Sequence, residues 1–496
     1  MELRTILISG MLSFYITYKI QYIHICISDM SALHYREPLQ EPHSVFYAAR
    51  QAIRRHATGG NLLILATLLA LIVANIPGVN DLYFSFWNQE VRLQIGGFNI
   101  FSHDGHPMSV IAFINDALMA VFFFTIGLEI KREILVGELS SFKKALLPII
   151  GAIGGMIVPV AIFMTMSAGT EYTRGGAIPM ATDIAFSLGL LAMLGSRVPL
   201  SLKVFLTTLA VVDDIGGIIV IATAYSTHIE MSLLLWALAL LGLLVLGSAL
   251  RIQTKIFYIG IGGVIWFLFL NSGVHPTIAS VLIAFCIPSK PVFAPRKYIK
   301  KIRESIGHFR QEDDTQLDRK SILSRDQMNW LKEIESASDK VISPLQDLED
   351  SLHPVVNFLI IPLFAFANAG IFLLNTNPAT IVEGLSLAII CGLVIGKFLG
   401  ILGFSWLTVK LGWAPMPEKA DWKMMSGVAM LGGIGFTVSL FVANLSFDSS
   451  TPAGQQLLDQ AKLGIVIGSF VAGLAGFLML RAFLPKHPVQ EDADEE

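Results

Sequence analysis

The sequence has few charged residues for its length. Lys, Arg, Asp and Glu together make up 15% of the 496 residues, whereas apolar residues make up 54%. Soluble globular domains ordinarily carry about 25% charged residues, so this composition cannot cover the surface of a soluble protein of this size. We therefore predict an all-α polytopic membrane protein.

Cysteine is also scarce. Cys26, Cys286 and Cys391 are odd in number and far apart, which argues against a disulfide framework and against metal-ligand spacing. The formal net charge is -3, and no basic stripe with interleaved aromatic residues occurs. We expect no cofactor and no nucleic-acid partner.

Long apolar runs are abundant instead. A helix of about 20 apolar residues spans the hydrocarbon core of a bilayer, which is about 30 Å thick. Twelve such runs are predicted as transmembrane helices, at residues 61–76, 108–130, 145–167, 177–194, 202–226, 231–250, 256–271, 274–288, 353–375, 384–408, 424–446 and 461–482.

These spans divide the chain into five parts. Residues 1–56 are predicted as an N-terminal extension, 57–288 as spans one to eight, 289–343 as a charged loop, 344–485 as spans nine to twelve and 486–496 as an acidic tail. The apolar stretch at 6–16 is not a convincing span, and the extension lacks the small-residue cleavage site of a signal peptide. Met30 is an alternative start.

Basic residues predict the orientation. Twelve spans place both termini on one side, and Lys and Arg gather in cytoplasmic loops. The loops on the opposite side hold few basic residues, such as Arg92, Arg174 and Lys462. Both termini and the loop 289–343 are therefore predicted to be cytoplasmic, because the other loops hold Lys131, Arg132, Lys143, Lys144, Arg197, Lys203, Arg251, Lys255, Lys410, Lys419 and Lys423.

The polar stretch between the first two spans contains an alternating pattern. Val91, Leu93 and Ile95 alternate with polar residues and are followed by two glycines at 96–97. This pattern is typical of a β-hairpin with a two-residue turn, which we predict from Val91 to Phe101 on the periplasmic side. An irregular loop fits the same residues equally well.

The fifth span carries two adjacent aspartates, Asp213 and Asp214, at its centre. A charged residue at the bilayer midplane costs roughly 2.5 to 3.5 kcal/mol or more, so these carboxylates should face water, a cation or a basic partner. Adjacent helical residues point about 100° apart, which lets one aspartate face a cavity while the other reaches a neighbouring helix.

Two spans contain residues that break helices. Pro179 precedes Thr182 and Asp183 in the fourth span, and the eleventh contains GGIG at 432–435. Unwound backbone at membrane depth is tolerated only inside protein or beside a polar cavity, so both breaks should lie near one site. Helix packing through small residues is an alternative explanation for the glycines, but not for Asp183.

Lys397 is the only basic residue deep inside a predicted span. Half-helix N-termini carry about +0.5 charge and C-termini about -0.5, so where two broken helices cross, Asp183 would compensate the positive ends and Lys397 the negative ends. A salt bridge from Lys397 to Asp213 or Asp214 is the other role we consider.

The chain resembles a known family through seven motifs. They are INDALMAVFFFTIGLEIKRE, AIPMATDIAFSLGLLAMLGSRVP, LAVVDDIGG, SGVHPTIA, PLFAFANAG, IGKFLG and GGIGFTVSLF, and they are similar to those of the NhaA family of bacterial sodium/proton antiporters from about residue 57 to 485. The family has inverted repeats and discontinuous helices. The resemblance implies that spans three to five and ten to twelve are the repeats, with spans four and eleven discontinuous.

The resemblance also implies roles for individual residues. Asp213 and Asp214 would bind Na+ or protons, Thr182 and Asp183 would lie at the crossing, Lys397 would pair with Asp213, Asp116 would lie nearby, and the hairpin would hold a homodimer. His275 matches a family histidine, although a polar residue at a helix start near the outer face is the better explanation for it. A pH response at the cytoplasmic mouth would involve Glu129, Lys131, Glu133, Glu349 and His353.

The function expected from these features is electrogenic export of Na+ or Li+ across the bacterial inner membrane in exchange for periplasmic protons. Protons and sodium would compete for the aspartate pair. An intramembrane prenyltransferase would need a further acidic residue close to the pair, and 215–225 has none. A passive sodium channel would need neither a buried lysine nor coupling to protons.

Overall fold

The computed structural model describes residues 59–92, 94–95, 98–99, 102–103, 106–225, 229–291, 295–311, 325–372, 384–449 and 451–485, all within the compact unit Thr58–Glu496. The predicted N-terminal extension, the glycines at 96–97, Phe101 and the tail 486–496 lie outside these residues.

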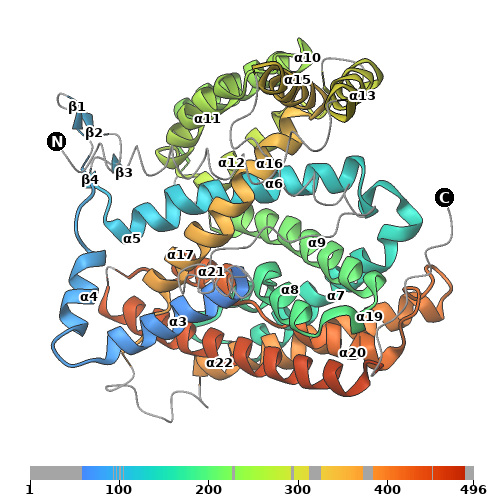
Figure 1. Cartoon of the computed structure of the whole chain (residues 1–496). Coiled ribbons are helices and arrows are strands. Elements are labelled where there is room, and N and C mark those ends of the chain that lie inside the picture. The colour runs from blue at the N-terminus through green and yellow to red at the C-terminus, as the bar shows by residue number, and fades with distance from the viewer. Residues whose placement is uncertain are drawn as a thin grey trace, which may run out of the picture. The chain divides into compact units, whose positions relative to one another are not determined.

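Among the described residues, seven helical segments are long and apolar enough to cross a membrane (Figure 1). The described chain is otherwise almost entirely helical, so this is a multi-pass membrane protein. Four of the seven are single helices, namely Phe142–Met166 (α7), Leu200–Ala224 (α9), Met231–Ala249 (α10) and Pro452–Phe483 (α22). The other three each contain a π-helical turn: Val110–Leu135 (α5, Val110–Phe113; η1, Ile114–Leu118; α6, Met119–Leu135), Pro344–Asn368 (α16, Pro344–Val355; η5, Val356–Ile360; α17, Ile361–Asn368) and Gly384–Lys410 (α18, Gly384–Cys391; η8, Gly392–Gly396; α19, Lys397–Lys410).

Three further apolar helix pairs are bent. They are α3 (Gly59–Asn75) with α4 (Asn80–Trp87) at 116°, η3 (Glu171–Met180) with α8 (Ile184–Met193) at 43°, and α20 (Trp422–Leu431) with α21 (Phe436–Ser446) at 42°. The helices α11 (Lys255–Leu270) and α12 (Pro276–Cys286) are apolar but shorter. A helix therefore occurs at each predicted span, whereas twelve crossings stay a prediction.

One helix begins much earlier than its predicted span. The twelfth span was expected from residue 461, but α22 begins at Pro452, where Thr451 accepts a hydrogen bond from Gly454 N at 3.1 Å. Lys462 was assigned to an outer loop, which is wrong, since it lies inside α22 and is 6% exposed. The polar first turns of α22 hid this start, because an apolar run was the criterion.

Short strands occur between α4 and α5. Strand β1 (Gln94–Ile95) pairs antiparallel with β2 (Phe98–Asn99), and β3 (Ser102–His103) pairs with β4 (His106–Pro107). The β1–β2 pairing brackets the two glycines of the predicted hairpin. The second pair was not predicted.

In the described part of the charged segment between α12 and α16, two helices, α13 (Pro295–Gln311) and α15 (Arg325–Val341), pack side by side (Figure 1). The sequence predicted only a charged loop there. Both helices are amphipathic, with apolar residues that recur three and four positions apart, but they are too polar to be recognised as spans.

Helix α7 packs against both α9 and α19, which carry the aspartate pair and Lys397 respectively. The contact with α19 includes a close approach of the two backbones at a pair of glycines. A Cβ atom added at Gly154 would lie 2.4 Å from the carbonyl oxygen of Gly400, and one added at Gly400 would lie 2.2 Å from that of Gly154. Glycine at both positions therefore sets the distance between α7 and α19.

This contact predicts the effect of a single methyl group. We expect Gly400→Ala to lower the free energy of unfolding by about 1 to 3 kcal/mol, because overpacking forces the two backbones apart. Gly403→Ala on the same helix is the control, since a Cβ there meets no described atom within 4 Å. Thermal unfolding in detergent measures both, and equal melting temperatures would contradict the close approach.

Candidate functional site

The two broken helix pairs cross at their breaks. Thr182 donates its hydroxyl hydrogen to the carbonyl of Gly432 at 2.9 Å, and Asp183 N donates to the carbonyl of Ile434 at 2.6 Å. One turn on, Ser187 Oγ donates to the carbonyl of Leu431 at 3.1 Å. The breaks lie at the residues for which the sequence predicted them, and they satisfy each other's backbone groups.

Asp183 lies at two helix N-termini at once. Its Oδ1 accepts a hydrogen bond from Phe186 N at 3.0 Å, which caps α8. Its Oδ2 accepts from the backbone N of Thr437 at 3.0 Å and from the Thr437 hydroxyl at 2.7 Å, in the first turn of α21. A carboxylate in this position balances the partial positive charge of both half-helices.

Lys397 is fully buried and forms an ion pair with Asp213 Oδ2. Its Nζ also donates to the hydroxyl of Thr182 at 2.9 Å, and that hydroxyl donates to Gly432, the C-cap residue of α20. Lys397 therefore contacts a carboxylate directly and a negative helix end through one hydroxyl. Each of the two roles considered from the sequence, the salt bridge and the compensation of helix ends, is thus matched by a contact. The π-helical turn Gly392–Gly396 immediately precedes it.

The remaining carboxylate oxygens of the pair have no partner among the described residues. Asp213 Oδ1 is buried and accepts no hydrogen bond from them. Asp214 is 5% exposed, and no ion pair or hydrogen bond joins its side chain to any described residue. Buried anionic oxygens without donors are costly, so this position favours a cation or a proton.

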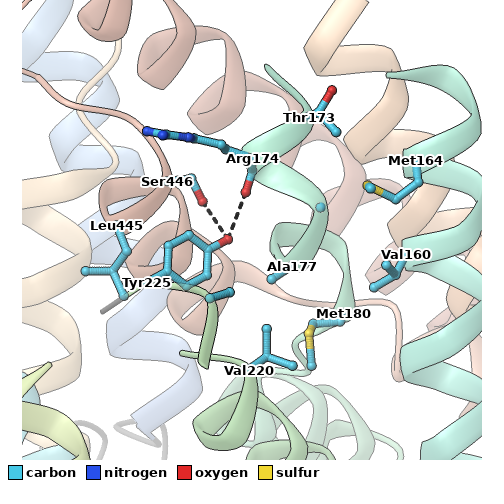
Figure 2. A pocket seen from close by; sticks show the side chains of 12 residues that line it. Val160, Met164, Thr173, Arg174, Ala177, Met180, Val220, Tyr225, Leu445 and Ser446 are labelled. Carbon is cyan, nitrogen blue, oxygen red and sulfur yellow. Dashed lines mark hydrogen bonds between the residues drawn. The ribbon is translucent and has the colours of Figure 1, made fainter. Parts of the chain in front are cut away.

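A cavity of about 500 Å³ lies beyond the break, between α7, η3 and the C-terminal ends of α9 and α21 (Figure 2). Met180 lines it on the side of the break. At its other side, the hydroxyl of Tyr225 donates to the carbonyl of Arg174 at 3.0 Å and accepts from Ser446 Oγ at 2.9 Å. No predicted site residue lines this cavity, and Tyr225 ties the end of α9 to both broken spans.

Asp116 lies apart from the aspartate pair in its contacts. It is part of a π-helical turn, Ile114–Leu118, and its Oδ1 is 3.9 Å from His275 Nε2. His275 is the N-cap residue of α12 and accepts a hydrogen bond from Thr277 N at 3.4 Å, as expected for a helix start. No ion pair or hydrogen bond between described residues joins Asp116 to Asp213 or Asp214.

Two of the five residues expected at the cytoplasmic mouth, Glu133 and Glu349, form ion pairs with the same residue, Arg132. Arg132 lies 2.9 Å from Glu349 and 3.3 Å from Glu133, in ion pairs. Lys131 instead donates to the carbonyls of Phe285 and Ile287 at the end of α12, at 2.7 and 2.5 Å. His353 is 2.9 Å from Asn357 Nδ2, one turn along the same helical segment, and Glu129 is half-buried on α6.

Comparison with known proteins identifies the family. The family model described as Na+/H+ antiporter 1 matches residues 50–480. The chain belongs to this family. It is 54% identical over 445 residues to the Na(+)/H(+) antiporter NhaA of Phocaeicola vulgatus, which covers 90% of this chain and 98% of the relative. The relatives of the same name from Bacteroides fragilis and Oleidesulfovibrio alaskensis are 53% and 42% identical, each over 86% of this chain and over 96% and 92% of their own length.

The sequence interpretation missed several residues that the structure places close to the predicted ones in this antiporter. Arg132 stands between two predicted residues, and Thr437 follows the glycines of the eleventh span. Asn368 is completely buried and hydrogen-bonds at 2.9 Å to Asn115 and to Asn444, from two other spans. Polar residues in apolar helices were the available signal.

Proposed function

We propose that the chain exports Na+ or Li+ from the cytoplasm in exchange for periplasmic protons. Membership of the Na+/H+ antiporter 1 family supports this exchange, and makes the chain a secondary transporter rather than an enzyme. The observation that carries the assignment of the site is the buried Asp213 Oδ1, which has no partner among the described residues, next to Asp214, a buried carboxylate without an ion pair to a described residue, and beside the ion pair of Asp213 with Lys397. The ions are substrates, and no cofactor is invoked.

Competition at the aspartate pair provides the coupling. A sodium ion and protons neutralise the same carboxylates, so binding of one expels the other. Lys397 already shares Asp213, so a sodium ion at that carboxylate also competes with the ammonium group. Two carboxyl groups, or one carboxyl group and Lys397, each release a proton for one monovalent cation, which makes the exchange electrogenic.

The crossing provides a rigid unit around which access alternates. Asp183 and Thr182 hold the two breaks through side-chain bonds that cross from one pair to the other. Moving these half-helices together carries the site from one side to the other without exposing their broken backbone to lipid. Asp116, next to His275, would act on ions approaching from the periplasmic side.

The proposed topology has twelve spans in the bacterial inner membrane, with both termini and the segment 289–343 in the cytoplasm. At the cytoplasmic mouth, Glu129, Lys131, Glu133, Glu349 and His353 would tune the response to pH. Arg132 joins this group, because it holds Glu133 and Glu349 together.

We also propose a homodimer held by the hairpin from Val91 to Phe101. Deleting this segment should convert the dimer to a monomer in detergent while sodium-dependent proton movement stays measurable, because the ion site is built within one chain. Light scattering gives the mass. A dimer that survives the deletion would contradict this interface.

Everted membrane vesicles test the exchange itself. With a preformed pH gradient reported by a fluorescent dye, added Na+ or Li+ should collapse the gradient, whereas added K+ should not. A passive channel would conduct sodium without this proton response. An equal response to all three cations, or to none, would contradict the proposed function.

A further inference from the structure

The helices α13 and α15 have no part in the exchange described above, yet they form the most charged described segment. Both ends of this segment meet at the end of the apolar helix α12. Leu345 N donates to the carbonyl of Pro288 at 3.2 Å, and the Gln253 side chain donates to that of Lys290 at 3.3 Å. In the proposed topology α12 is a membrane span, and the helix pair would then start and finish next to the membrane surface at its end.

One side of α13 faces α15. Lys301 Nζ is 2.7 Å from Glu333, and Ser305 Oγ donates to the same carboxylate at 3.2 Å. The hydrogen bond with Glu333 raises the pKa of Lys301. Further along, Lys340 Nζ lies 5.6 Å from the ring centre of Tyr298. These contacts show which face of α13 packs against α15.

Two exposed basic residues lie on the opposite side. The sequence of α13 contains six Lys or Arg and one acidic residue, Glu304. At about 100° per residue, Lys300 and Arg303 lie about 60° apart and roughly 160° from the contacts with α15. Lys300 has a side chain that is 79% exposed and lies 3.6 Å from Glu304, one turn further on, and Arg303 is also exposed. We call Lys300 and Arg303 the basic face of α13.

We propose that the basic face of α13 binds the phosphate headgroups of anionic phospholipids in the leaflet next to α12. Juxtamembrane clusters of Lys and Arg bind anionic lipid surfaces, and their attraction acts within a screening length of about 8 to 10 Å. Val341 and Pro344 are three residues apart, so α15 cannot leave the start of α16 by more than about 10 Å.

The apolar residue beside the basic face also suits a lipid surface. Ile299 is 47% exposed next to Lys300, where it would be poorly accommodated in water but well placed at a headgroup boundary. An acidic soluble protein would match the positive charge as well. The hydrogen bond between Leu345 and Pro288, which keeps the segment near the end of α12, favours a lipid surface instead. The inference depends on the multi-pass arrangement and not on which ions are exchanged.

Hydrogen exchange of the full chain in nanodiscs tests the proposal. Discs of phosphatidylcholine alone are compared with discs containing one third phosphatidylglycerol. Amides of α13 should exchange on the order of tenfold more slowly in the anionic discs, and 0.5 M salt (about a 4 Å screening length) should remove most of the difference. The double variant Lys300→Gln with Arg303→Gln should lose most of this slowing, whereas Lys332→Gln, an exposed lysine on α15, should keep it.

The remaining outcomes also decide the question. Equal exchange of α13 in both discs, or slowing that survives the double variant, would overturn the proposal and point to a protein or purely apolar contact. Exchange of α15 reports whether the double variant still forms the helix pair, because Lys301 and Glu333 are unchanged in it. Sodium-dependent proton movement, measured on the same samples, separates a failure of this inference from a failure of the antiporter assignment.

Discussion

Asp214→Asn should abolish sodium-dependent proton movement while leaving the protein folded. A positioned proton-transferring group is worth on the order of 100-fold or more in rate, and an amide neither titrates nor balances a cation. Asp214 forms no ion pair with a described residue, so its replacement removes no structural contact. Dye fluorescence in everted vesicles measures the exchange, and thermal unfolding measures the fold.

Asp213→Asn should lose exchange as well, but with a second effect. It removes the ionic partner of the buried Lys397, and breaking a buried pair typically costs about 3 to 5 kcal/mol of stability. The two variants should therefore differ in melting temperature. Asp326→Asn, an exposed aspartate on α15, is the control for both measurements. Near-normal exchange in either site variant would rule out the shared carboxylate site.

Substitutions of Lys397 should separate its two possible roles. Lys397→Ala leaves Asp213 buried without a cation and Thr182 without its donor, so we expect a loss of about 3 to 5 kcal/mol in stability. Lys397→Arg keeps a positive charge, but its guanidinium cannot release a proton at any pH at which the protein works. In Lys397→His the side chain titrates at a much lower pH than lysine. If Lys397 carries a proton, both basic replacements should change the charge moved per sodium ion.

Current on a solid-supported membrane, divided by the sodium flux, gives that charge. We expect the ratio to change in Lys397→Arg, because the direct contact with Asp213 outweighs the indirect contact with the helix end. An unchanged ratio, with only the melting temperature lowered in Lys397→Ala, would show that Lys397 is structural and that both protons come from the aspartates.

The centre of the site could be predicted from sequence because buried charge is expensive. Asp213, Asp183 and Lys397 each stand out in an apolar run, and the cost of leaving them unpaired predicts that partners lie close by. The breaks in spans four and eleven could be predicted for a similar reason, since Pro179 and the glycines at 432–435 interrupt helices. Each of these signals is local in the chain.

Other features depend on contacts between distant residues and could not be predicted in this way. Arg132 looked like an ordinary loop cation until the fold placed Glu349 beside it. The buried chain through Asn368 joins three spans that no spacing relates. Lys462 was assigned to a loop because the first turns of α22 are polar. Hydropathy alone therefore predicted that this helix begins at residue 461, nine residues after its observed start. The α13–α15 pair was missed because it is amphipathic rather than apolar.

Proton release on sodium binding tests the central claim most directly. Sodium is titrated into the purified protein in lightly buffered detergent solution while a pH indicator reports released protons, and calorimetry in two buffers of different ionisation enthalpy counts them. Competition for the aspartate pair predicts that between one and two protons are released per sodium ion bound, and that Asp214→Asn releases fewer and binds sodium more weakly. Sodium binding without proton release in the wild-type protein, or unchanged release in Asp214→Asn, would contradict the account.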